Sequence, residues 1–260
     1  MLQGIFDSHA HYDDEAFDGD REALLEALPG RGICGVVNCA SDLATAQTCV
    51  ALARRYPYFY AAVGIHPHEA AKAPADWRER LESLSQEEKV VAIGEIGLDY
   101  HYDFSPRELQ RDLLAEQLAF AKERGLPVIL HDREAHGDMM ELLRKVRPKG
   151  VMHCFSGSVE LMRETVALGM YIGLGGAVTF KNARVPVEVA KEVPLDRLLL
   201  ETDCPYMTPV PLRGKRNDSA NIPLTAEKIA QVRSMEAQAL VDQCRRNTCE
   251  LFGISERSLF

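Results

Sequence analysis

The chain has 260 residues, of which 46% are hydrophobic and 27% charged, and its 30 basic and 39 acidic side chains give a net charge of −9. These are the proportions of a folded globular protein, and they exclude a disordered chain. The acidic excess argues against a protein that coats DNA through clustered basic residues. A chain of this length buries enough surface to fold without a metal, so any metal site would be there for chemistry.

The seven cysteines include no C-x-x-C pair, and their odd number is typical of reduced thiols inside cells. No apolar run approaches the roughly 20 residues of a membrane span, and the N-terminus lacks the basic and apolar segments of a signal peptide. We therefore expect a cytoplasmic protein that has no membrane association. No obligate protein partner is evident from the sequence.

Short apolar runs alternate with amphipathic stretches along the whole chain, and no linker rich in Pro, Gly or Ser divides it. Strands are predicted at residues 4–9, 33–39, 59–64, 90–95, 127–131, 150–153, 170–173 and 198–203. Helices are predicted at residues 20–28, 42–56, 75–84, 106–124, 135–146, 158–168 and 185–193, and a last helical pattern covers residues 225–249. The pattern indicates eight βα units in a single domain, residues 1–260.

The strands at the centre of these units are apolar on both faces. Residues 128–130 and 198–200 consist only of Val, Ile and Leu, as in a parallel sheet covered by helices. Eight such units in about 250 residues predict an α/β fold, the (β/α)8 TIM barrel. A doubly wound open sheet is the alternative, but the chain has no G-x-G-x-x-G motif and no phosphate-binding loop.

Metal-ligand side chains occur at the C-terminal ends of five predicted strands, where barrel active sites are built. They are His9 and His11 on the first strand, Glu95 on the fourth, His131 on the fifth, His153 on the sixth and Asp203 on the eighth. Any one of them alone is more often a hydrogen-bonded structural residue, but six at one rim predict a metal site. Imidazole and carboxylate ligands suit Zn, Mn, Co or Ni, and Mg less well. Six ligands exceed the three of one catalytic zinc, so two divalent ions are expected.

Further polar residues follow the third and fifth strands at the same rim. His66 either contacts the substrate or hydrogen-bonds within its loop, and for His68 the structural role is favoured. Arg133 lies two residues after His131, where it binds a substrate phosphate or forms a surface ion pair. Asp99 is expected to be structural or to support the metal ligands.

The residues around the eighth strand supply two more candidates. The basic cluster at residues 213–217, which includes Arg216 and Asn217, follows this strand and is either a phosphate contact or a solvated surface. Glu201 lies two residues before Asp203, so both side chains face the same way in an extended chain. Glu201 is therefore expected to support the metal ligands from behind.

Seven segments in chain order resemble the TatD family of metal-dependent hydrolases. They are DSHAH at 7–11, VGIHPH at 63–68, IGEIGLDY at 93–100, HDREA at 131–135, HCFSGS at 153–158, GAVTFKN at 176–182 and LETDCPY at 200–206. The resemblance runs from residue 7 to about residue 217 and covers most of the chain. It implies a TIM barrel related to the amidohydrolases, a divalent metal centre and nuclease activity, usually removal of nucleotides from the 3′ end of DNA.

The resemblance also implies a role for each ligand. His9 and His11 would hold one ion, His131 and His153 the other, with Glu95 bridging and Asp203 completing the site and orienting or deprotonating the attacking water. The chain departs from the family at Asp132, where Ser, Cys or Thr is more common, and this adds a charge near the metals. It departs again after Arg216 and Asn217, where the family's acidic residue and proline are replaced by Asp218 and Ser219, with a proline only at residue 223.

Two ions about 3.5 to 4 Å apart can activate a water, hold a phosphoryl oxygen and neutralise the leaving oxygen, and a phosphodiester needs all three. The ligand set predicts hydrolysis without specifying the bond, and the resemblance favours nucleic acid. We therefore expect a 3′–5′ exodeoxyribonuclease that acts on single-stranded 3′ ends, with Asp203 and Glu95 as catalytic residues. The alternatives are hydrolysis of a small amide, ester or lactone at the same centre, and a metal-binding protein without catalysis.

Overall fold

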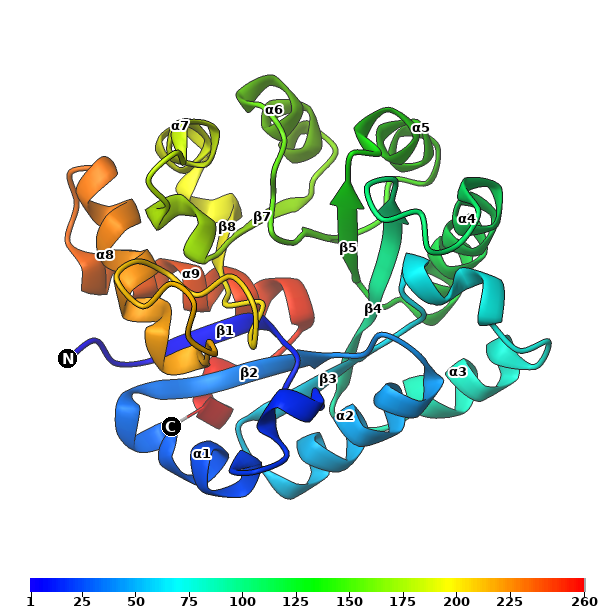
Figure 1. Ribbon diagram of the computed structural model, residues 1–260, viewed down its shortest axis with the longest axis horizontal. Helices are drawn as coiled ribbons and strands as arrows, with labels where there is room; N and C mark the ends of the chain where they lie inside the picture. Colours follow the sequence, from blue (N-terminus) through cyan, green and yellow to red (C-terminus); the bar gives the residue numbers. More distant parts are fainter. Residues whose placement is uncertain (260) are drawn as a thin grey trace.

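The computed structural model describes residues 1–259 and shows eight parallel strands enclosed by helices (Figure 1). Each strand pairs in parallel with the next one in the sequence. The strands are β1 (Ile5–Ala10), β2 (Ile33–Cys39), β3 (Phe59–Val63), β4 (Val90–Asp99), β5 (Val128–Arg133), β6 (Gly150–Met152), β7 (Tyr171–Leu174) and β8 (Leu198–Leu200). This order and pairing confirm the predicted TIM barrel.

The barrel closes between β1 and the segment that follows β8. The N–H of Asp203 donates to the carbonyl of His9 (3.0 Å), and the N–H of His11 donates to the carbonyl of Cys204 (2.8 Å). A parallel bridge pairs Ala10 with Cys204. The closure thus joins two segments that carry predicted metal ligands.

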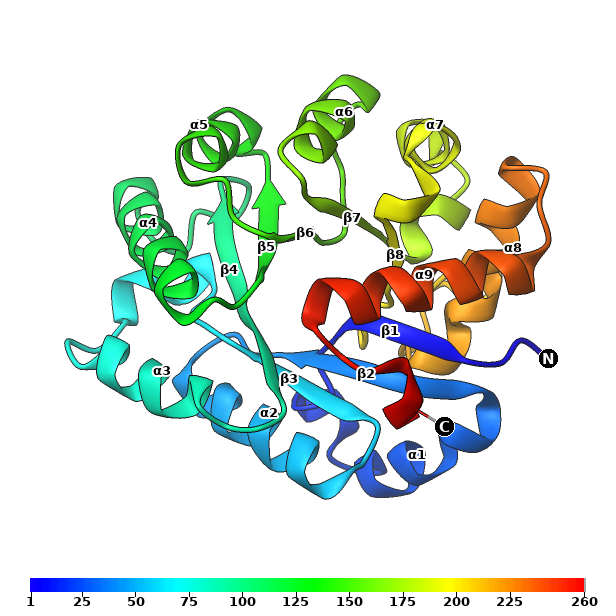
Figure 2. The same cartoon turned by 180° about the vertical axis from the view of Figure 1, so that it is seen from behind.

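Helices follow the strands and cover the outside of the barrel in both views (Figures 1 and 2). They are α1 (Arg21–Ala27), α2 (Leu43–Arg55), α3 (Trp77–Ser85), α4 (Arg107–Arg124), α5 (His136–Val146), α6 (Val159–Ala167), α7 (Arg184–Glu192), α8 (Ile222–Val232) and α9 (Ala237–Phe252). The last helix runs beside β1 and β8 (Figure 2). Within the described residues, no helix has both the length and the hydropathy of a membrane span.

The helical pattern predicted over residues 225–249 is two helices in the structure. Ser234 has a φ of 52°, and the N–H of Met235 donates to the carbonyl of Ala230 (3.0 Å). This left-handed residue with its backward hydrogen bond ends α8, as at many helix C-termini. The chain then turns and begins α9 at Ala237.

The ends of β4 and β8 differ from the prediction in ways that affect the site. β4 continues past Glu95 because its pairing with β5 extends to Asp99 opposite Arg133. The prediction of strand structure up to Asp203 is wrong, because β8 ends at Leu200 and Asp203 has a φ of 58°. The chain therefore turns across the mouth of the barrel where the last predicted ligand lies.

The strands are buried on both faces, which accounts for their continuous apolar sequences. Every residue of β1 to β4 is buried, and only the last three residues of β5 are partly or fully exposed. The backbones of β4 and β5 come so close that a Cβ at Gly97 would lie 1.9 Å from the carbonyl oxygen of His131. A side chain at this position would push β5, and with it His131, away from Glu95.

Candidate metal centre

The six predicted metal ligands lie together at the C-terminal mouth of the barrel. Three groups of side chains have donor atoms that all lie within 4.8 Å of one another. The groups are His9 with Glu95 and His153, His9 with His11 and Asp203, and His66 with Glu95 and His131. The groups share His9 and Glu95, so they form one continuous cluster.

Glu95 lies at the centre of this cluster, and its two oxygens face different imidazoles. Oε2 is 3.4 Å from Nε2 of both His9 and His11. Oε1 is 2.7 Å from His153 Nε2 and 2.9 Å from His131 Nδ1. One carboxylate therefore touches two sets of donors, which is the arrangement that a bridging ligand requires.

Asp203 completes the side of the cluster formed by β1. Its Oδ1 is 3.6 Å from His9 Nε2 and 3.4 Å from His11 Nε2. Its side chain is 18% exposed, whereas that of Glu95 is 4% exposed. Asp203 is thus the more accessible of the two carboxylates from the mouth.

Burial and mutual contact strongly perturb the protonation of these groups. Burial and the charge of His153 lower the pKa of His9 to about 4. Burial also disfavours charge on His11, but the hydrogen bond with Asp203 and the charge of Glu95 raise its pKa to about 10. Burial would raise the pKa of Glu95, yet the surrounding histidines, His153 first, hold it well below the usual value. The lowered pKa values of Glu95 and Asp203 keep both carboxylates ionised, and their negative charge favours a cation among the imidazoles.

The donor set fits divalent metal ions. The Nε2 atoms of His9 and His11 approach to 3.0 Å, and neighbouring backbone already binds His11 Nδ1, which lies 2.9 Å from the carbonyl of Cys39. The Nε2 lone pairs of both rings thus converge on one region, as in a metal-binding pair. Imidazole and carboxylate donors without a thiolate suit Zn, Mn, Co or Ni.

Asp99 is a supporting residue that the sequence left undetermined. Its Oδ2 accepts hydrogen bonds from His131 Nε2 (3.1 Å) and His68 Nε2 (2.9 Å). A proton on His131 Nε2 leaves the Nδ1 lone pair directed at Glu95 and the centre. The spacing from Glu95 to Asp99 is the sequence feature that indicates this role, because strand residues four apart share a face. The apolar pattern, however, predicts a strand that ends at residue 95.

Glu201 lies behind His153. It is 1% exposed, its Oε1 accepts a hydrogen bond from the N–H of Cys154, and the same oxygen lies 3.9 Å from His153 Nδ1. Burial raises the pKa of Glu201 to about 8. Within residues 1–259, Glu201 Oε2 and His153 Nδ1 are buried without a hydrogen-bond partner. His153 thus has Glu95 beside its Nε2 atom and Glu201 on the side of its Nδ1 atom.

Asp7, another buried carboxylate, holds the segment that carries Asp203. Its oxygens accept hydrogen bonds from the N–H and Oγ1 of Thr202 (3.0 and 2.6 Å) and from Ser219 Oγ (2.6 Å). Burial raises its pKa to about 6 in spite of these contacts. This role of Asp7 could not be predicted locally, because its partners lie about 200 residues away in the chain.

The predicted substrate-binding residues lie in different surroundings, some facing the donor cluster and others not. His66 is buried, and its Nε2 lies 3.6 Å from Glu95 Oε1, so it faces the donor cluster. Arg133 is exposed, with its guanidinium carbon 4.7 Å from the ring centroid of Tyr102. Among the described residues, no carboxylate pairs with Arg133. Arg133 is thus available for a phosphate.

The two predicted substrate-binding residues after β8 are engaged by other parts of the chain. Arg216 forms two hydrogen bonds of 2.7 Å with the carboxylate of Asp20 and lies over the ring of Phe17. Asn217 is 0% exposed, and its amide donates to the carbonyls of Thr202 and Tyr206 (3.2 and 2.8 Å). This enclosure contradicts a direct substrate contact by Asn217; the residue positions the chain after Asp203 instead.

Asp132 does not direct its charge at the metal ligands. Its Oδ2 lies 2.7 Å from His136 Nδ1, at the first turn of α5. Strand neighbours point to opposite faces, which explains why Asp132 and His131 diverge. The departure from the family pattern at this position therefore affects the start of α5 rather than the centre.

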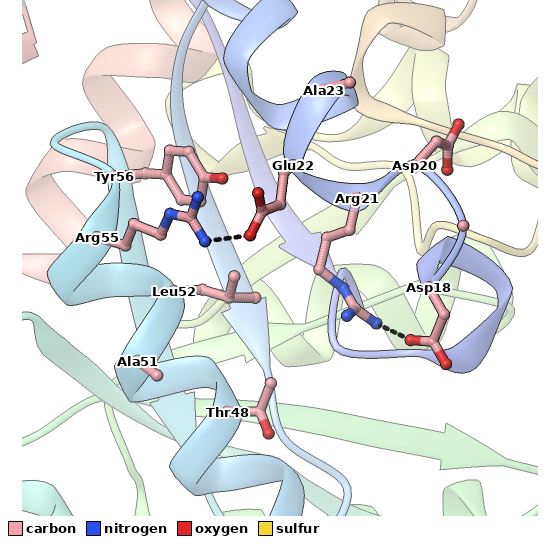
Figure 3. Close-up of a pocket in the computed structure, with 11 residues that line it drawn as sticks. Asp18, Asp20, Arg21, Glu22, Ala23, Thr48, Ala51, Leu52, Arg55 and Tyr56 are labelled. Carbon is pink, nitrogen blue, oxygen red and sulfur yellow. Dashed lines mark hydrogen bonds and ion pairs between the residues drawn. The ribbon is translucent and has the colours of Figure 1, made fainter.

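A pocket of about 580 Å³ lies between α1 and α2 (Figure 3). Four of its charged side chains pair with each other, Arg55 with Glu22 and Arg21 with Asp18, whereas Asp20 pairs with Arg216. None of the six predicted ligands lines this pocket. It is therefore separate from the candidate metal centre.

A TIM barrel with four histidines and two carboxylates at its C-terminal mouth defines the class of barrel hydrolases that use metal ions. The chain belongs to the TatD related DNase family, whose sequence profile matches residues 6–253. The resemblance seen in the sequence is thus confirmed.

Individual relatives agree with this assignment. The chain is 41% identical over 254 residues to the uncharacterized metal-dependent hydrolase YabD of Bacillus subtilis strain 168, covering 96% of this chain and 100% of the relative. It is 34% identical to the 3′-5′ ssDNA/RNA exonuclease TatD of Escherichia coli K12, with 96% and 100% coverage. The crystal structure of YjjV, a TatD homologue from the same organism, superposes with a TM-score of 0.92 at 35% identity, covering 98% and 100% of the two chains.

Proposed function

We propose that the protein is a metal-dependent phosphodiesterase that removes nucleotides from the 3′ end of single-stranded nucleic acid. The observation that carries the proposal is the position of Glu95, whose two oxygens face separate pairs of histidines. Relatives that bear the name 3′-5′ ssDNA/RNA exonuclease TatD support the substrate class. The free thiol form of all seven cysteines agrees with action in the cytoplasm.

In this proposal the cluster would hold two ions. His9, His11 and Asp203 would hold one ion and His131 and His153 the other, with Glu95 as a ligand available to both. Such ions, when bound, supply an activated water and neutralise charge on the phosphoryl and leaving oxygens. The remaining chemistry belongs to the side chains around them.

Asp203 has the accessibility and the charge of a general base. Burial opposes its ionisation, but the hydrogen bond with His11 and the charges of His153 and His9 lower its pKa. It is therefore a carboxylate at neutral pH, and it can accept a proton from a water at the mouth. Arg133 is exposed and lies at the end of β5, and in this proposal its planar guanidinium holds a substrate phosphate.

The test is digestion of single-stranded DNA and RNA labelled at the 5′ end, by metal-loaded wild type and the Asp203→Asn variant. We expect stepwise shortening from the 3′ end, abolished by EDTA, and a kcat lower by about 100-fold or more in Asp203→Asn because the proton acceptor is lost. Asp196→Asn makes the same chemical change at an exposed site and should retain full activity.

Two outcomes would contradict the proposal. Full activity of Asp203→Asn, with the same melting temperature as wild type, would remove Asp203 from the reaction. Intact oligonucleotides together with metal-dependent hydrolysis of a small ester, amide or lactone would replace the nuclease by the small-molecule hydrolase.

A further inference from the structure

Two aromatic side chains are exposed in the segment between β4 and α4. Tyr102 is 48% exposed and Phe104 is 67% exposed. Their rings are stacked, with centroids 5.2 Å apart and an interplanar angle of 15°. We call this pair the aromatic ledge. Two large rings that lie side by side and remain open to solvent point to a binding surface.

The ledge is held in place by hydrogen bonds at both ends of its segment. Asp99 Oδ1 accepts from the N–H groups of His101 (3.0 Å) and Tyr102 (2.9 Å). Buried Gln110 donates to the carbonyls of Asp99 and Ser105 (3.1 and 2.8 Å). The rings thus lie on an ordered segment. Stacking of a ligand on them therefore costs little conformational entropy of the protein.

The ledge is continuous with the metal centre. His68 meets both rings edge to face, with centroids 5.6 Å from Tyr102 and 4.8 Å from Phe104. The same imidazole shares Asp99 Oδ2 with His131. A molecule stacked on the ledge would therefore lie one side chain away from a predicted metal ligand.

A positive charge accompanies the ledge. The guanidinium of Arg133 lies over the Tyr102 ring, and within residues 1–259 it has no ion-pair partner. The contact with the ring restrains the guanidinium, whose N–H groups can still bind an anion. A flat aromatic surface beside a free guanidinium matches one nucleotide, which combines a base with a phosphate.

We propose that the aromatic ledge stacks an unpaired nucleobase of the substrate while Arg133 holds the adjoining phosphate. This inference rests on the proposed nuclease function and extends it. Stacking on aromatic side chains recognises any base with a free face, which favours single strands without selecting a sequence. Bases within a duplex are already stacked between their neighbours. The ledge thus accounts for a preference for single-stranded ends.

The test compares variants of Phe104 on oligonucleotides that carry one abasic nucleotide, moved stepwise from the 3′ end. In wild type, one abasic position should raise KM about 10-fold, which equals about 1.4 kcal/mol of lost stacking. Phe104→Ala should raise KM about 10-fold on the intact strand and be insensitive to that abasic position, with kcat largely retained. Phe104→Trp should keep the wild-type pattern, whereas Phe104→Leu should behave like Ala because it lacks a π-face.

Leu109→Ala is the matched control, because Leu109 is 44% exposed on the neighbouring helix and lies outside the ledge. It should leave both KM values unchanged. Binding of the same strands, measured by fluorescence anisotropy in the Asp203→Asn background, gives a second readout without turnover. Arg133→Gln should weaken this binding and reduce its dependence on salt.

The outcomes separate this inference from the proposed function. Active enzyme with the same abasic profile in wild type and Phe104→Ala would overturn the ledge and leave the nuclease intact. Base-dependent binding that is lost in Phe104→Ala, without cleavage of any strand by wild type, would support the ledge and overturn the nuclease. Neither binding nor cleavage would overturn both.

Discussion

Asp99 shows how one side chain can organise two parts of a site. Its Oδ2 accepts hydrogen bonds from two imidazoles, and its Oδ1 accepts from the two backbone N–H groups that begin the ledge segment. Burial alone would raise its pKa, but the hydrogen bond from His131 and the backbone and His68 contacts hold it well below the usual value. Asp99 is therefore an ionised acceptor that fixes both the His131 tautomer and the ledge.

The Asp99→Asn substitution tests the role of Asp99 toward His131. The amide oxygen can keep the backbone contacts, but the amide NH2 then faces His131 and cannot accept its proton. His131 should shift to the tautomer with the proton on Nδ1, and affinity for the ion held there should fall about 10- to 100-fold. Calorimetric titration with Zn or Mn measures this change. Asp103→Asn, at an exposed carboxylate in the same segment, is the control; equal affinity in the wild type and Asp99→Asn would refute the positioning role.

The strands and helices could be predicted from the sequence more accurately than the residues at which they end. Strands that are buried on both faces appear as continuous apolar runs, so the eight βα units and the ligands directly after them could be found by local pattern. Strand and helix ends depend on contacts with neighbours. β4 reaches Asp99 because β5 lies beside it, and the turn at Ser234 separates α8 from α9.

Contacts with distant parts of the chain explain why the surroundings of Arg216 and Asn217 could not be predicted from the sequence. Arg216 is paired with Asp20, 196 positions away, and the amide of Asn217 binds carbonyls of the segment around Asp203. A basic cluster gives no local sign of such a partner. Arg133 was a candidate only through its position two residues after His131, and its guanidinium forms no ion pair with a carboxylate of residues 1–259.

The start of α5 contains a pH-dependent contact between His136 and Asp132. The hydrogen bond to Asp132, 2.7 Å long, raises the pKa of His136. The folded protein therefore binds this proton more tightly than the unfolded chain does. The contact stabilises the fold fully below the unfolded pKa of about 6.5, and this contribution is lost as the pH rises through the folded pKa.

We accordingly expect His136→Gln to lower the free energy of unfolding more at about pH 5.5 than at about pH 9. The His136 side chain is 38% exposed, so solvent screening limits the difference to about 0.5 kcal/mol. Urea denaturation at both pH values, with metal content held constant, measures it. The difference should vanish when His136→Gln is made in an Asp132→Asn background, and a difference of the same size there would assign it to another group.

Considered as a whole, the molecule combines an acidic chain with one local site for an anion. The net charge of −9 repels nucleic acid at long range. If the proposed function holds, attraction has to come from the metal centre and from Arg133 at the mouth, where the substrate would be in direct contact. We would then expect stronger binding of short single-stranded ends than of long duplexes, and binding that is sensitive to salt.

The metal centre should stabilise the barrel without being needed for folding. The apolar core extends over all eight strands and their helices, whereas the donor cluster brings buried histidines and carboxylates together at one end. An ion that binds only the folded state at 100 times its Kd adds about 2.7 kcal/mol, which raises the Tm by about 5 to 10 °C. Calorimetric scans with EDTA and with increasing Zn or Mn should show a cooperative transition in both and a concentration-dependent shift with metal. His153→Asn should reduce the shift, because it removes a donor next to Glu95. Loss of the cooperative transition in EDTA would show instead that the fold depends on its metal.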